Sequence, residues 1–360
     1  MVKEFNKAMK LLIITQKVDV NDDVLGFFIE WIRKLASKVE QVIVICLFKG
    51  KYDLPDNVKV FSLGKEEGAS KLKYLKHFYE YIWKLKNDYD SVFVHMNPKY
   101  VVLGAPFWKM WEKKIVLWYA HGYTPPALKI ADKLTDIAVA STPEGYRIPG
   151  TKKLKVIGQG IDTERFKPIQ DPRSKIQDPF KVVSVGRITP SKDYETLIKA
   201  AEILKDSGAK FKVEIAGQPA TGSDIEYMEK LKKALENKKM TDVFKFIGPI
   251  ANKDLPPFLR SADLFVNMSH TGSLDKAILE AMACGLPVLT CNEALINVLG
   301  NYGDQLMFPK RNDKALVEKI NFMMKMPREK KEIISSDMRK IVVENHNLDG
   351  FINKLLVELY

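Results

Sequence analysis

Residues 271–289 read Thr-Gly-Ser-Leu-Asp-Lys-Ala-Ile-Leu-Glu-Ala-Met-Ala-Cys-Gly-Leu-Pro-Val-Leu, a pattern that predicts a helix followed by a β-strand. Ser273 is the expected N-cap of this helix, and Gly285 is its expected end. Free backbone N–H groups at such a helix start favour an anion, and Asp275 lies in the first turn. Glu280 interrupts an otherwise apolar run, where burying a carboxylate without a partner is costly. The stretch therefore predicts an anion at the helix start and a hydrogen-bonding carboxylate about one turn further in.

Short apolar runs alternate with amphipathic stretches along the rest of the chain. In the first part, the expected strands are 11–15, 41–47, 58–62, 91–95, 115–119, 137–140 and 154–157. Helical patterns lie between several of them, such as 24–38 and 69–86. The pattern restarts after 169–178, a charged stretch with Pro172 and little apolar content that is typical of a linker. The strands expected there are 181–185, 212–215, 244–247, 264–266, 288–290 and 305–308, and the helices are 194–207, 224–238, 254–261, 275–284 and 314–326.

This alternation predicts an α/β chain whose parallel sheets are covered by helices on both faces. Two such series of similar length indicate two doubly wound, Rossmann-like domains that face each other across a cleft. We assign 1–165 to the N-terminal domain and 166–345 to the C-terminal domain. A closing amphipathic helix within 346–360 is expected to pack back on the first domain. Ligands of such sheets bind beyond the carboxyl ends of the strands, which here means the cleft.

The composition is that of an ordinary globular protein, with 360 residues of which 46% are hydrophobic, enough for two sizeable cores. No apolar run approaches the roughly 18 residues that a membrane span needs. The run at 11–14 is too short for a signal-peptide core, which favours a first strand. Cys46, Cys284 and Cys291 have no metal-like spacing, which favours reduced core residues of a cytoplasmic protein.

The net charge of +12 is concentrated in the first part of the chain, where 1–168 contains 28 Lys and Arg against 19 Asp and Glu. Such an excess favours anionic partners: a nucleotide, a phosphorylated substrate, an anionic membrane surface or nucleic acid. Nucleic acid is the poorest of these, because no recognition motif is present and the basic excess is spread over the first domain.

A short basic loop opens the second domain. Residues 182–193 read Val-Val-Ser-Val-Gly-Arg-Ile-Thr-Pro-Ser-Lys-Asp, a strand that runs into Gly186 with a helix beginning near the end of the segment. Arg187 and Lys192 flank the carboxyl end of this strand, where a cleft ligand would lie. A guanidinium and an ammonium on one loop can hold two oxygens of a diphosphate. A solvated basic loop is the alternative for this pair taken alone.

An ordered set of motifs makes the chain similar to a known family. In the second domain the motifs are Gly-Arg-x4-Lys-Asp (186–193), Ala-Gly (216–217), Phe-Ile-Gly-Pro-Ile (246–250), Asp-Leu-Pro (254–256), Ser-Ala-Asp-Leu-Phe-Val-x-x-Ser (261–269) and Leu-Glu-Ala-Met-Ala-Cys-Gly-Leu-Pro-Val (279–288). In the first domain they are Tyr-Ala-His-Gly (119–122) and Gly-Gln-Gly-Ile-Asp-x3-Phe (158–166). The chain resembles the retaining GT-B glycosyltransferases of family 4, the group 1 transferases, over nearly its whole length.

The resemblance implies roles for individual residues. Glu280 matches the second glutamate of the family's Glu-x7-Glu motif, which binds the ribose hydroxyls of the donor nucleotide. Arg187 and Lys192 match the pair that holds the donor diphosphate. His121 matches the histidine that reaches toward the donor sugar and its phosphate. The other positions that the resemblance and the helix start assign to donor binding are Gly186, Gly217, Ile250, Ser273, Leu274, Asp275 and Lys276.

One departure from the family pattern concerns the donor sugar. The first glutamate of Glu-x7-Glu, which contacts this sugar in the family, is replaced by Gly272. Ser273, Asp275 and Lys276 are candidates to take over part of its contact. Lys276 also lies four residues before Glu280 on one helix face, so a plain salt bridge is the alternative to a ligand-binding carboxylate.

A second departure lies in the first strand–helix loop, 16–23, which lacks the paired glycines frequent in the family. Asn21, Asp22 and Asp23 stand there instead, on the side that would face the acceptor. Their side chains are candidates for orienting an acceptor hydroxyl or assisting its deprotonation. Solvated loop charges are the alternative.

Residues 71–86 combine an apolar helix face with a set of lysines, Lys71, Lys73, Lys76, Lys84 and Lys86. Two interpretations remain open. The favoured one is a core-packed helix with a solvated basic face. The sharper one is a peripheral contact with an anionic membrane that brings the cleft to a lipid-linked acceptor.

The resemblance implies a hexosyltransferase that moves a sugar, with retention, from a UDP- or GDP-linked donor to a hydroxyl of a glycan or glycolipid. It implies a front-face route without a protein nucleophile and without a cofactor. The absence of metal-like spacing among His, Asp and Glu predicts metal independence. We expect a cytoplasmic enzyme of polysaccharide or glycolipid biosynthesis, peripheral at the inner membrane face if the 71–86 contact exists. The alternative, motivated by Gly272, is a non-catalytic nucleotide-sugar-binding or regulatory homologue.

Overall fold

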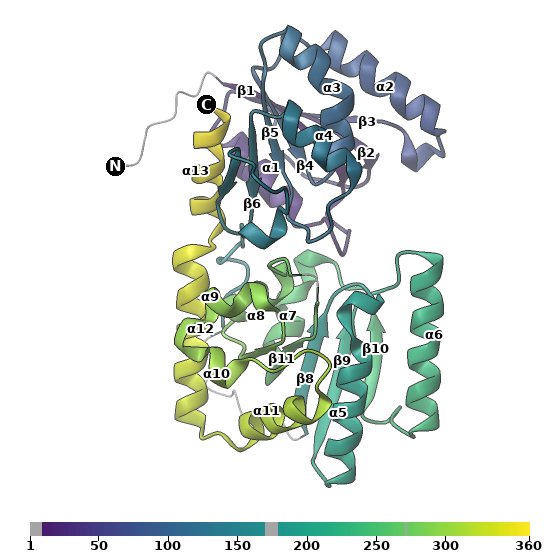
Figure 1. Ribbon diagram of the computed structural model, residues 1–360, viewed down its shortest axis with the longest axis vertical. Helices are drawn as coiled ribbons and strands as arrows, with labels where there is room; N and C mark the ends of the chain where they lie inside the picture. The colour runs from purple at the N-terminus through teal and green to yellow at the C-terminus, as the bar shows by residue number, and fades with distance from the viewer. Residues whose placement is uncertain (1–8, 170–178, 271) are drawn as a thin grey trace. The chain divides into compact units, whose positions relative to one another are not determined.

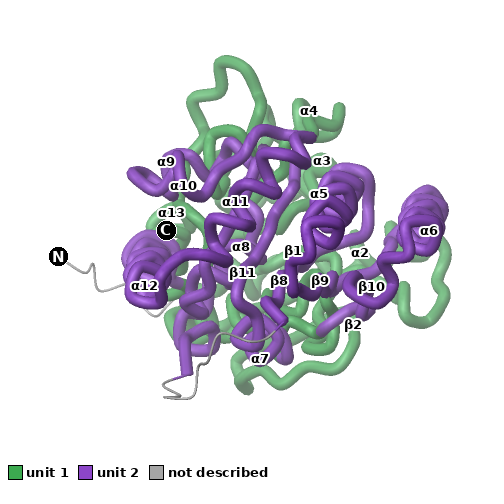
Figure 2. Tube along the Cα trace, turned by 90° about the horizontal axis from the view of Figure 1, so that it is seen from below, with its two compact units in different colours: residues 1–160, 251–253, 348–360 green, residues 161–250, 254–347 purple. Residues whose placement is uncertain are grey.

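The computed structural model describes residues 9–169, 179–270 and 272–360 and divides the chain into two compact units (Figures 1 and 2). Unit 1 comprises Met1–Gly160, Ala251–Lys253 and Leu348–Tyr360, and unit 2 comprises Ile161–Ile250 and Asp254–Asn347. The division after Gly160 lies slightly before the 165–166 boundary proposed from the sequence. Nearly all of the expected linker at 169–178 lies outside the described residues.

A seven-stranded parallel sheet of order β3-β2-β1-β4-β5-β6-β7 forms the centre of unit 1. Its strands are β1 (Lys10–Val18), β2 (Gln41–Lys49), β3 (Val58–Ser62), β4 (Ser91–His95), β5 (Lys114–Trp118), β6 (Ile137–Ala140) and β7 (Leu154–Val156). The chain winds outward from β1 to β3 and then from β4 in the opposite direction. This is the doubly wound order, with its switch point between β1 and β4.

Helices cover both faces of this sheet (Figure 1). They are α1 (Phe28–Ala36), α2 (Lys71–Lys84), α3 (Pro98–Met110), α4 (Pro126–Leu134) and α13 (Leu348–Leu359). In β1, Leu11 and Ile13 join the core that includes α1 and α13, whereas Leu12 and Ile14 join the core that includes α2, α3 and α4. A strand with alternate side chains buried on both sides needs a helical layer on each face.

The final helix, α13, belongs to unit 1 and packs against α1, β4 and β5. The Phe351 ring centroid lies 4.2 Å from that of Trp31. The Ser91 hydroxyl donates a hydrogen bond to the carbonyl of Leu359 at 2.8 Å, and the Trp31 indole N–H donates one to the carbonyl of Gly160 at 3.2 Å. The end of the chain thus completes the core of a unit whose last strand, β7, ends at Val156, far earlier in the sequence.

Unit 2 has a five-stranded parallel sheet of order β10-β9-β8-β11-β12. Its strands are β8 (Phe180–Val185), β9 (Phe211–Ala216), β10 (Phe244–Gly248), β11 (Leu264–Asn267) and β12 (Val288–Thr290). Its helices are α5 (Tyr194–Asp206), α6 (Gly222–Asn237), α7 (Leu255–Arg260), α8 (Lys276–Ala283), α9 (Ile296–Leu299), α10 (Gly303–Leu306), α11 (Asp313–Lys325) and α12 (Arg328–Asn345). The switch point falls between β8 and β11. The sequence-based expectation of two doubly wound domains is therefore confirmed.

Unit 2 differs from the expectation at one strand and at the helices α9 and α12. The strand expected at 305–308 is wrong, since the short helix α10 overlaps it and only Met307 forms an isolated bridge with Thr290. The helix α12 was not anticipated. Its buried side chains, Ile334, Met338 and Val342, stand four residues apart, so the amphipathic signal was present although weak among many charges.

The helix α2 buries less of its apolar face than a core-packed helix would. Phe78 and Ile82 are buried, whereas Leu72 is 80% exposed and Trp83 is 52% exposed. No helix within the described ranges is long and apolar enough to cross a membrane.

Candidate functional site

Four strands of unit 2 end side by side at the carboxyl edge of its sheet. Gly217 follows β9, Gly186 follows β8, Asn267 ends β11 and Thr290 ends β12. The edge at a switch point is where doubly wound sheets bind ligands. These four residues therefore mark the candidate site of unit 2.

Two glycines let the backbones of β8 and β9 approach closely there. Gly186 has φ 154° and Gly217 has φ 152°, which residues with a side chain rarely adopt. A Cβ on Gly217 would lie 1.9 Å from the carbonyl oxygen of Gly186. A Cβ on Gly186 would lie 3.3 Å from the Cε atom of Lys192. Glycine at position 217 thus makes room for the backbone of Gly186, and glycine at position 186 makes room for the Lys192 side chain.

Lys192 forms an ion pair with Asp275 at this edge. The Lys192 Nζ atom lies 2.8 Å from Asp275 Oδ2, and Asn267 Nδ2 donates to the same oxygen at 2.8 Å. The Thr290 hydroxyl in turn donates to Asn267 Oδ1 at 3.2 Å. Burial alone would raise the pKa of the Asp275 carboxyl, but the charge of Lys192 and hydrogen bonds from Lys192, Asn267 and Ser269 outweigh it and lower this pKa. The carboxylate therefore stays ionised at neutral pH.

Arg187 follows Gly186 directly, and its side chain is exposed. The loop backbone is fixed by hydrogen bonds from Gly186 N to Ala216 O at 3.0 Å and from Ile188 N to Gln218 O at 3.0 Å. Within the ranges described, no carboxylate forms an ion pair with Arg187. A guanidinium held by a fixed loop at a strand end can bind an anion without first leaving another partner.

Glu280 lies on α8 and is 2% exposed. The Lys276 Nζ atom lies 3.7 Å from Glu280 Oε1, and the Lys276 side chain is 15% exposed. Burial lowers the pKa of the Lys276 ammonium, while Glu280 and Asp162 act in the opposite direction. The ion pair between Lys276 and Glu280 is thus present. It is compatible with a Glu280 carboxylate that also binds a ligand.

The start of α8 differs from the expectation. Ser273 was the predicted N-cap, but the helix begins at Lys276 with Asp275 as its N-cap residue. The Asp275 side chain makes no capping hydrogen bond because Lys192 and Asn267 hold it. A carboxylate of the chain itself therefore stands near the helix start where the sequence predicted a bound anion.

Three other donor-site candidates are held by the body of unit 2. Ser273 is buried, and its carbonyl accepts a hydrogen bond from Asn292 Nδ2 at 2.8 Å. The Leu274 side chain lies in the hydrophobic core, and Ile250 packs partly buried against it. Only the backbone of Leu274 could therefore contact a donor. Gly272 has φ 64°, a left-handed conformation that favours glycine.

In unit 1, His121 lies in the turn after β5. Its N–H donates to the carbonyl of Gly145 at 3.0 Å, and its Nδ1 atom accepts a hydrogen bond from the Tyr123 N–H at 3.0 Å. A ring whose Nδ1 accepts carries its proton on Nε2 in the neutral form. His121 can therefore donate a hydrogen bond from Nε2.

The acceptor-side candidates of unit 1 are engaged in local structure. The Asp22 carboxylate accepts from Val24 N at 3.0 Å and pairs with Lys17 at 2.5 Å. It thereby closes the turn before α1, which explains why that helix begins later than expected. Asn21 Oδ1 accepts from Lys253 Nζ at 2.8 Å, and Asp23 is partly buried. These contacts favour a structural role for Asp22.

No group of three or more His, Cys, Asp or Glu side chains that could hold a metal ion occurs among the described residues. His95 ends β4 and stacks on Phe28 with ring centroids 4.1 Å apart. Its burial lowers its pKa to about 3, so the ring stays neutral. His95 therefore belongs to the core of unit 1.

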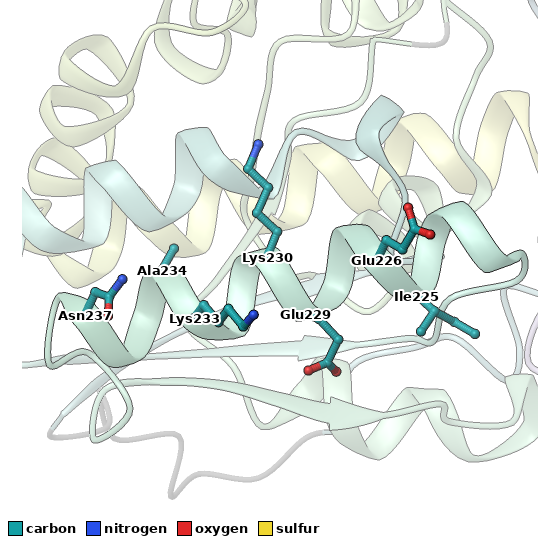
Figure 3. A pocket seen from close by; sticks show the side chains of 7 residues that line it. All are labelled: Ile225, Glu226, Glu229, Lys230, Lys233, Ala234 and Asn237. Carbon is teal, nitrogen blue, oxygen red and sulfur yellow. The ribbon is translucent and has the colours of Figure 1, made fainter.

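A shallow hollow follows the outer side of α6 (Figure 3). It is lined by Ile225, Glu226, Glu229, Lys230, Lys233, Ala234 and Asn237. Its two carboxylates and two ammonium groups balance in charge, and none of the candidate donor residues lines it. We assign it no function.

Sequence reasoning missed Asn267 and Thr290, which hold Asp275 in place. Asn267 fell on an unassigned position of the 261–269 motif. A polar residue that ends a buried apolar strand was the available signal, because the ends of parallel strands point toward the ligand edge.

Part of the chain matches a known protein family. Residues 166–340 match the family model described as glycosyl transferases group 1. Mannosylfructose-phosphate synthase of Agrobacterium fabrum is 29% identical over 195 residues, which cover 50% of this chain and 42% of that protein. D-inositol 3-phosphate glycosyltransferase of Salinispora arenicola is 31% identical over 152 residues, which cover 38% of this chain and 34% of that protein. The chain thus spans less than half the length of these relatives.

Solved structures resemble the whole chain. HepE of Anabaena, in complex with UDP, has a TM-score of 0.75 at 19% identity and covers 97% of this chain and 99% of its own. Sucrose-phosphate synthase of Thermosynechococcus elongatus has a TM-score of 0.79 at 16% identity, and the match covers 97% of this chain and 98% of that protein. At such identities the likeness concerns the fold alone. The chain therefore has the GT-B fold with two Rossmann-like domains, and its residues 166–340 match the group 1 glycosyltransferases.

Proposed function

We propose that this chain is a retaining glycosyltransferase of family 4, which transfers a hexosyl group from a UDP- or GDP-linked donor to a hydroxyl of a glycan or glycolipid. One observation carries the proposal: Arg187 and Lys192 flank the glycine-lined carboxyl edge of β8 and β9 in unit 2. The group 1 family match over the same residues supports it, as does a relative that is named as a glycosyltransferase.

The chemistry follows from the charges at this edge. When the sugar–phosphate bond of the donor breaks, negative charge builds on the diphosphate. Arg187 and Lys192 stabilise that charge more in the transition state than in the ground state, which is what accelerates the reaction. The role proposed for Glu280 is to accept hydrogen bonds from the ribose hydroxyls. The role proposed for His121, whose Nδ1 accepts from the Tyr123 N–H, is to donate a hydrogen bond from Nε2 to the donor. The proposed route is front-face and uses no protein nucleophile, metal or cofactor.

The first experiment identifies the donor. Thermal shifts with UDP-, GDP- and ADP-linked sugars reveal the base, because a bound ligand stabilises in proportion to the logarithm of its excess over Kd. Hydrolysis of the selected donor, and transfer to a panel of acceptors, then measure turnover. Binding without any turnover across a broad panel would favour the non-catalytic alternative that Gly272 motivates.

Glu280→Gln is expected to raise the donor KM by about 10- to 100-fold, because a charge-assisted hydrogen bond to ribose contributes about 1.5–3 kcal/mol. Lys276→Met is the matched variant, since it removes the ion-pair partner and leaves the carboxylate. Steady-state kinetics and thermal melting are measured on both. If both variants lower stability alike and leave the donor KM unchanged, Glu280 serves only the ion pair.

We further propose that unit 1 contacts an anionic membrane from the cytoplasmic side, through α2 and the end of α3. Besides Leu72 and Trp83, Met110 is exposed, at 61%. The Trp83 ring lies 5.5 Å from that of Trp111, and Lys86 Nζ lies 4.9 Å over Trp83. Exposed apolar and aromatic side chains among lysines fit the interface between lipid chains and anionic headgroups.

The triple variant K73E/K76E/K84E is expected to weaken binding to liposomes containing anionic lipid by about 100-fold or more, since each lysine contributes about 1 kcal/mol near such a surface. Co-sedimentation at low and high salt measures this. The control, K230E/K232E/K233E on α6, changes the charge equally on unit 2 and should leave binding intact. Equal loss in both variants, or no salt-sensitive binding by the unmodified protein, would contradict the membrane contact.

A further inference from the structure

The candidate diphosphate site already contains an anion of the chain. Lys192 Nζ lies 2.8 Å from Asp275 Oδ2, and both side chains are 16% exposed, so the pair is accessible at the edge of the sheet. An ammonium has three N–H donors, and Asp275 engages one. The part of the chain that the structure describes offers Lys192 Nζ no second acceptor. The ammonium can therefore bind a further anion while it stays paired with Asp275.

Asp275 is held independently of Lys192. Asn267 Nδ2 donates to its carboxylate from the end of β11, and the Thr290 hydroxyl orients Asn267 from the end of β12. The carboxylate is thus fixed by two strand ends, whereas Lys192 comes from the loop after β8 and is the longer, more flexible side chain. The rigid partner of this pair is the aspartate.

We propose that Asp275 is a positioning residue, which fixes the Lys192 ammonium at the end of β8 and offsets part of the positive charge that a nucleoside diphosphate meets there. The inference rests on the proposed function of this edge as the donor diphosphate site. Two anions that share one ammonium lie about 5 Å apart and repel each other. The carboxylate therefore orients the lysine for the reacting diphosphate and weakens the hold on the nucleoside diphosphate product.

Asp275→Asn tests the charge without removing the contact. The amide oxygen of asparagine can still accept from Lys192 and Asn267, but it carries no charge. We expect UDP or GDP, whichever nucleotide the unmodified protein prefers, to bind Asp275→Asn about 10-fold more tightly in calorimetry at low salt. The difference should shrink at high salt because screening weakens the repulsion. Asp275→Ala removes both the charge and the hydrogen-bond acceptor that holds Lys192. We expect Asp275→Ala to lower kcat, whereas Asp275→Asn should mainly lower the donor KM.

Asp242→Asn is the matched control. Asp242 forms an ion pair with Lys205 at the same distance, 2.8 Å, but the pair is more exposed, and Asp242 precedes β10 at the amino end of the sheet's strands. Its replacement should leave nucleotide affinity unchanged. A second check is pH: since Lys192 keeps the pKa of Asp275 low, acidification to about pH 5 should not reproduce the tighter binding of Asp275→Asn.

The outcomes separate this inference from the proposed function. If the unmodified protein binds nucleotide and Arg187→Ala weakens that binding, the diphosphate site stands. Unchanged or weaker binding by Asp275→Asn would then overturn the role of Asp275 alone, and so would a gain in the Asp242→Asn control. If the unmodified protein and every variant fail to bind UDP and GDP at millimolar concentrations, the donor site itself is contradicted, and the inference falls with it.

Discussion

Arg187→Ala is expected to lower kcat/KM for sugar transfer by about 100- to 1000-fold, the effect of removing one preorganised group that stabilises transition-state charge. Arg187 has no ion-pair partner among the residues described, and it is exposed directly after the end of β8. Its whole charge is therefore available to the leaving diphosphate. For the same reason its loss should leave the free energy of unfolding within about 0.5 kcal/mol of the unmodified protein.

Steady-state kinetics with the selected donor and urea unfolding measure these two quantities. Arg187→Lys separates charge from geometry, since lysine keeps the charge and loses the planar fork, and it should restore part of kcat. Arg328→Ala removes another exposed arginine of unit 2, one paired with Glu332, and should leave kcat/KM unchanged. An Arg187→Ala enzyme with full activity would remove this residue from the mechanism.

The sequence predicted those parts of the fold that local patterns determine. Alternating apolar runs and helical stretches gave two doubly wound domains, and β1 illustrates why, since four successive buried residues, Leu11–Ile14, require cover on both faces. Gly186 and Arg187 could also be placed from the sequence, because they are the first two residues after an apolar strand. The strand expected at 305–308 failed because a short apolar run does not by itself distinguish a strand from a turn of helix.

The partners of the site residues could not be predicted, because they join segments far apart in the chain. Asp275 looked like a first-turn residue of a helix capped by Ser273, yet its carboxylate pairs with Lys192, 83 residues earlier. Serine and aspartate are about equally favoured as N-caps, so local preference does not distinguish Ser273 from Asp275. In the structure Asp275 is the N-cap residue, and its carboxylate is engaged by Lys192 and Asn267. Asp22 shows the reverse case. It was proposed as an acceptor-side carboxylate, but it accepts hydrogen bonds from the backbone N–H groups of Val24 and Leu25 in the adjacent turn.

Gly217→Ala is expected to destabilise unit 2 by about 3 kcal/mol or more, among the largest effects of any single substitution at this edge. The added Cβ would lie 1.9 Å from the Gly186 carbonyl oxygen, which is backbone and cannot move aside as a flexible side chain could. The φ of 152° is also unfavourable for alanine. Because Gly186 N and Ala216 O are hydrogen-bonded at 3.0 Å, relief of the clash would separate the ends of β8 and β9.

Thermal melting should show this as a fall in Tm of about 6–12 °C for a unit of this size. Gly222→Ala is the matched control: Gly222 begins α6 in the same unit, and a Cβ there meets nothing within 4 Å. It should be neutral or stabilising by about 0.5 kcal/mol, because alanine restricts the unfolded chain more than glycine does. The two variants add the same methyl group, but only at Gly217 does it meet backbone atoms and a φ that is unfavourable for alanine. A Gly217→Ala protein as stable as Gly222→Ala would show that the two strand ends are not in close contact.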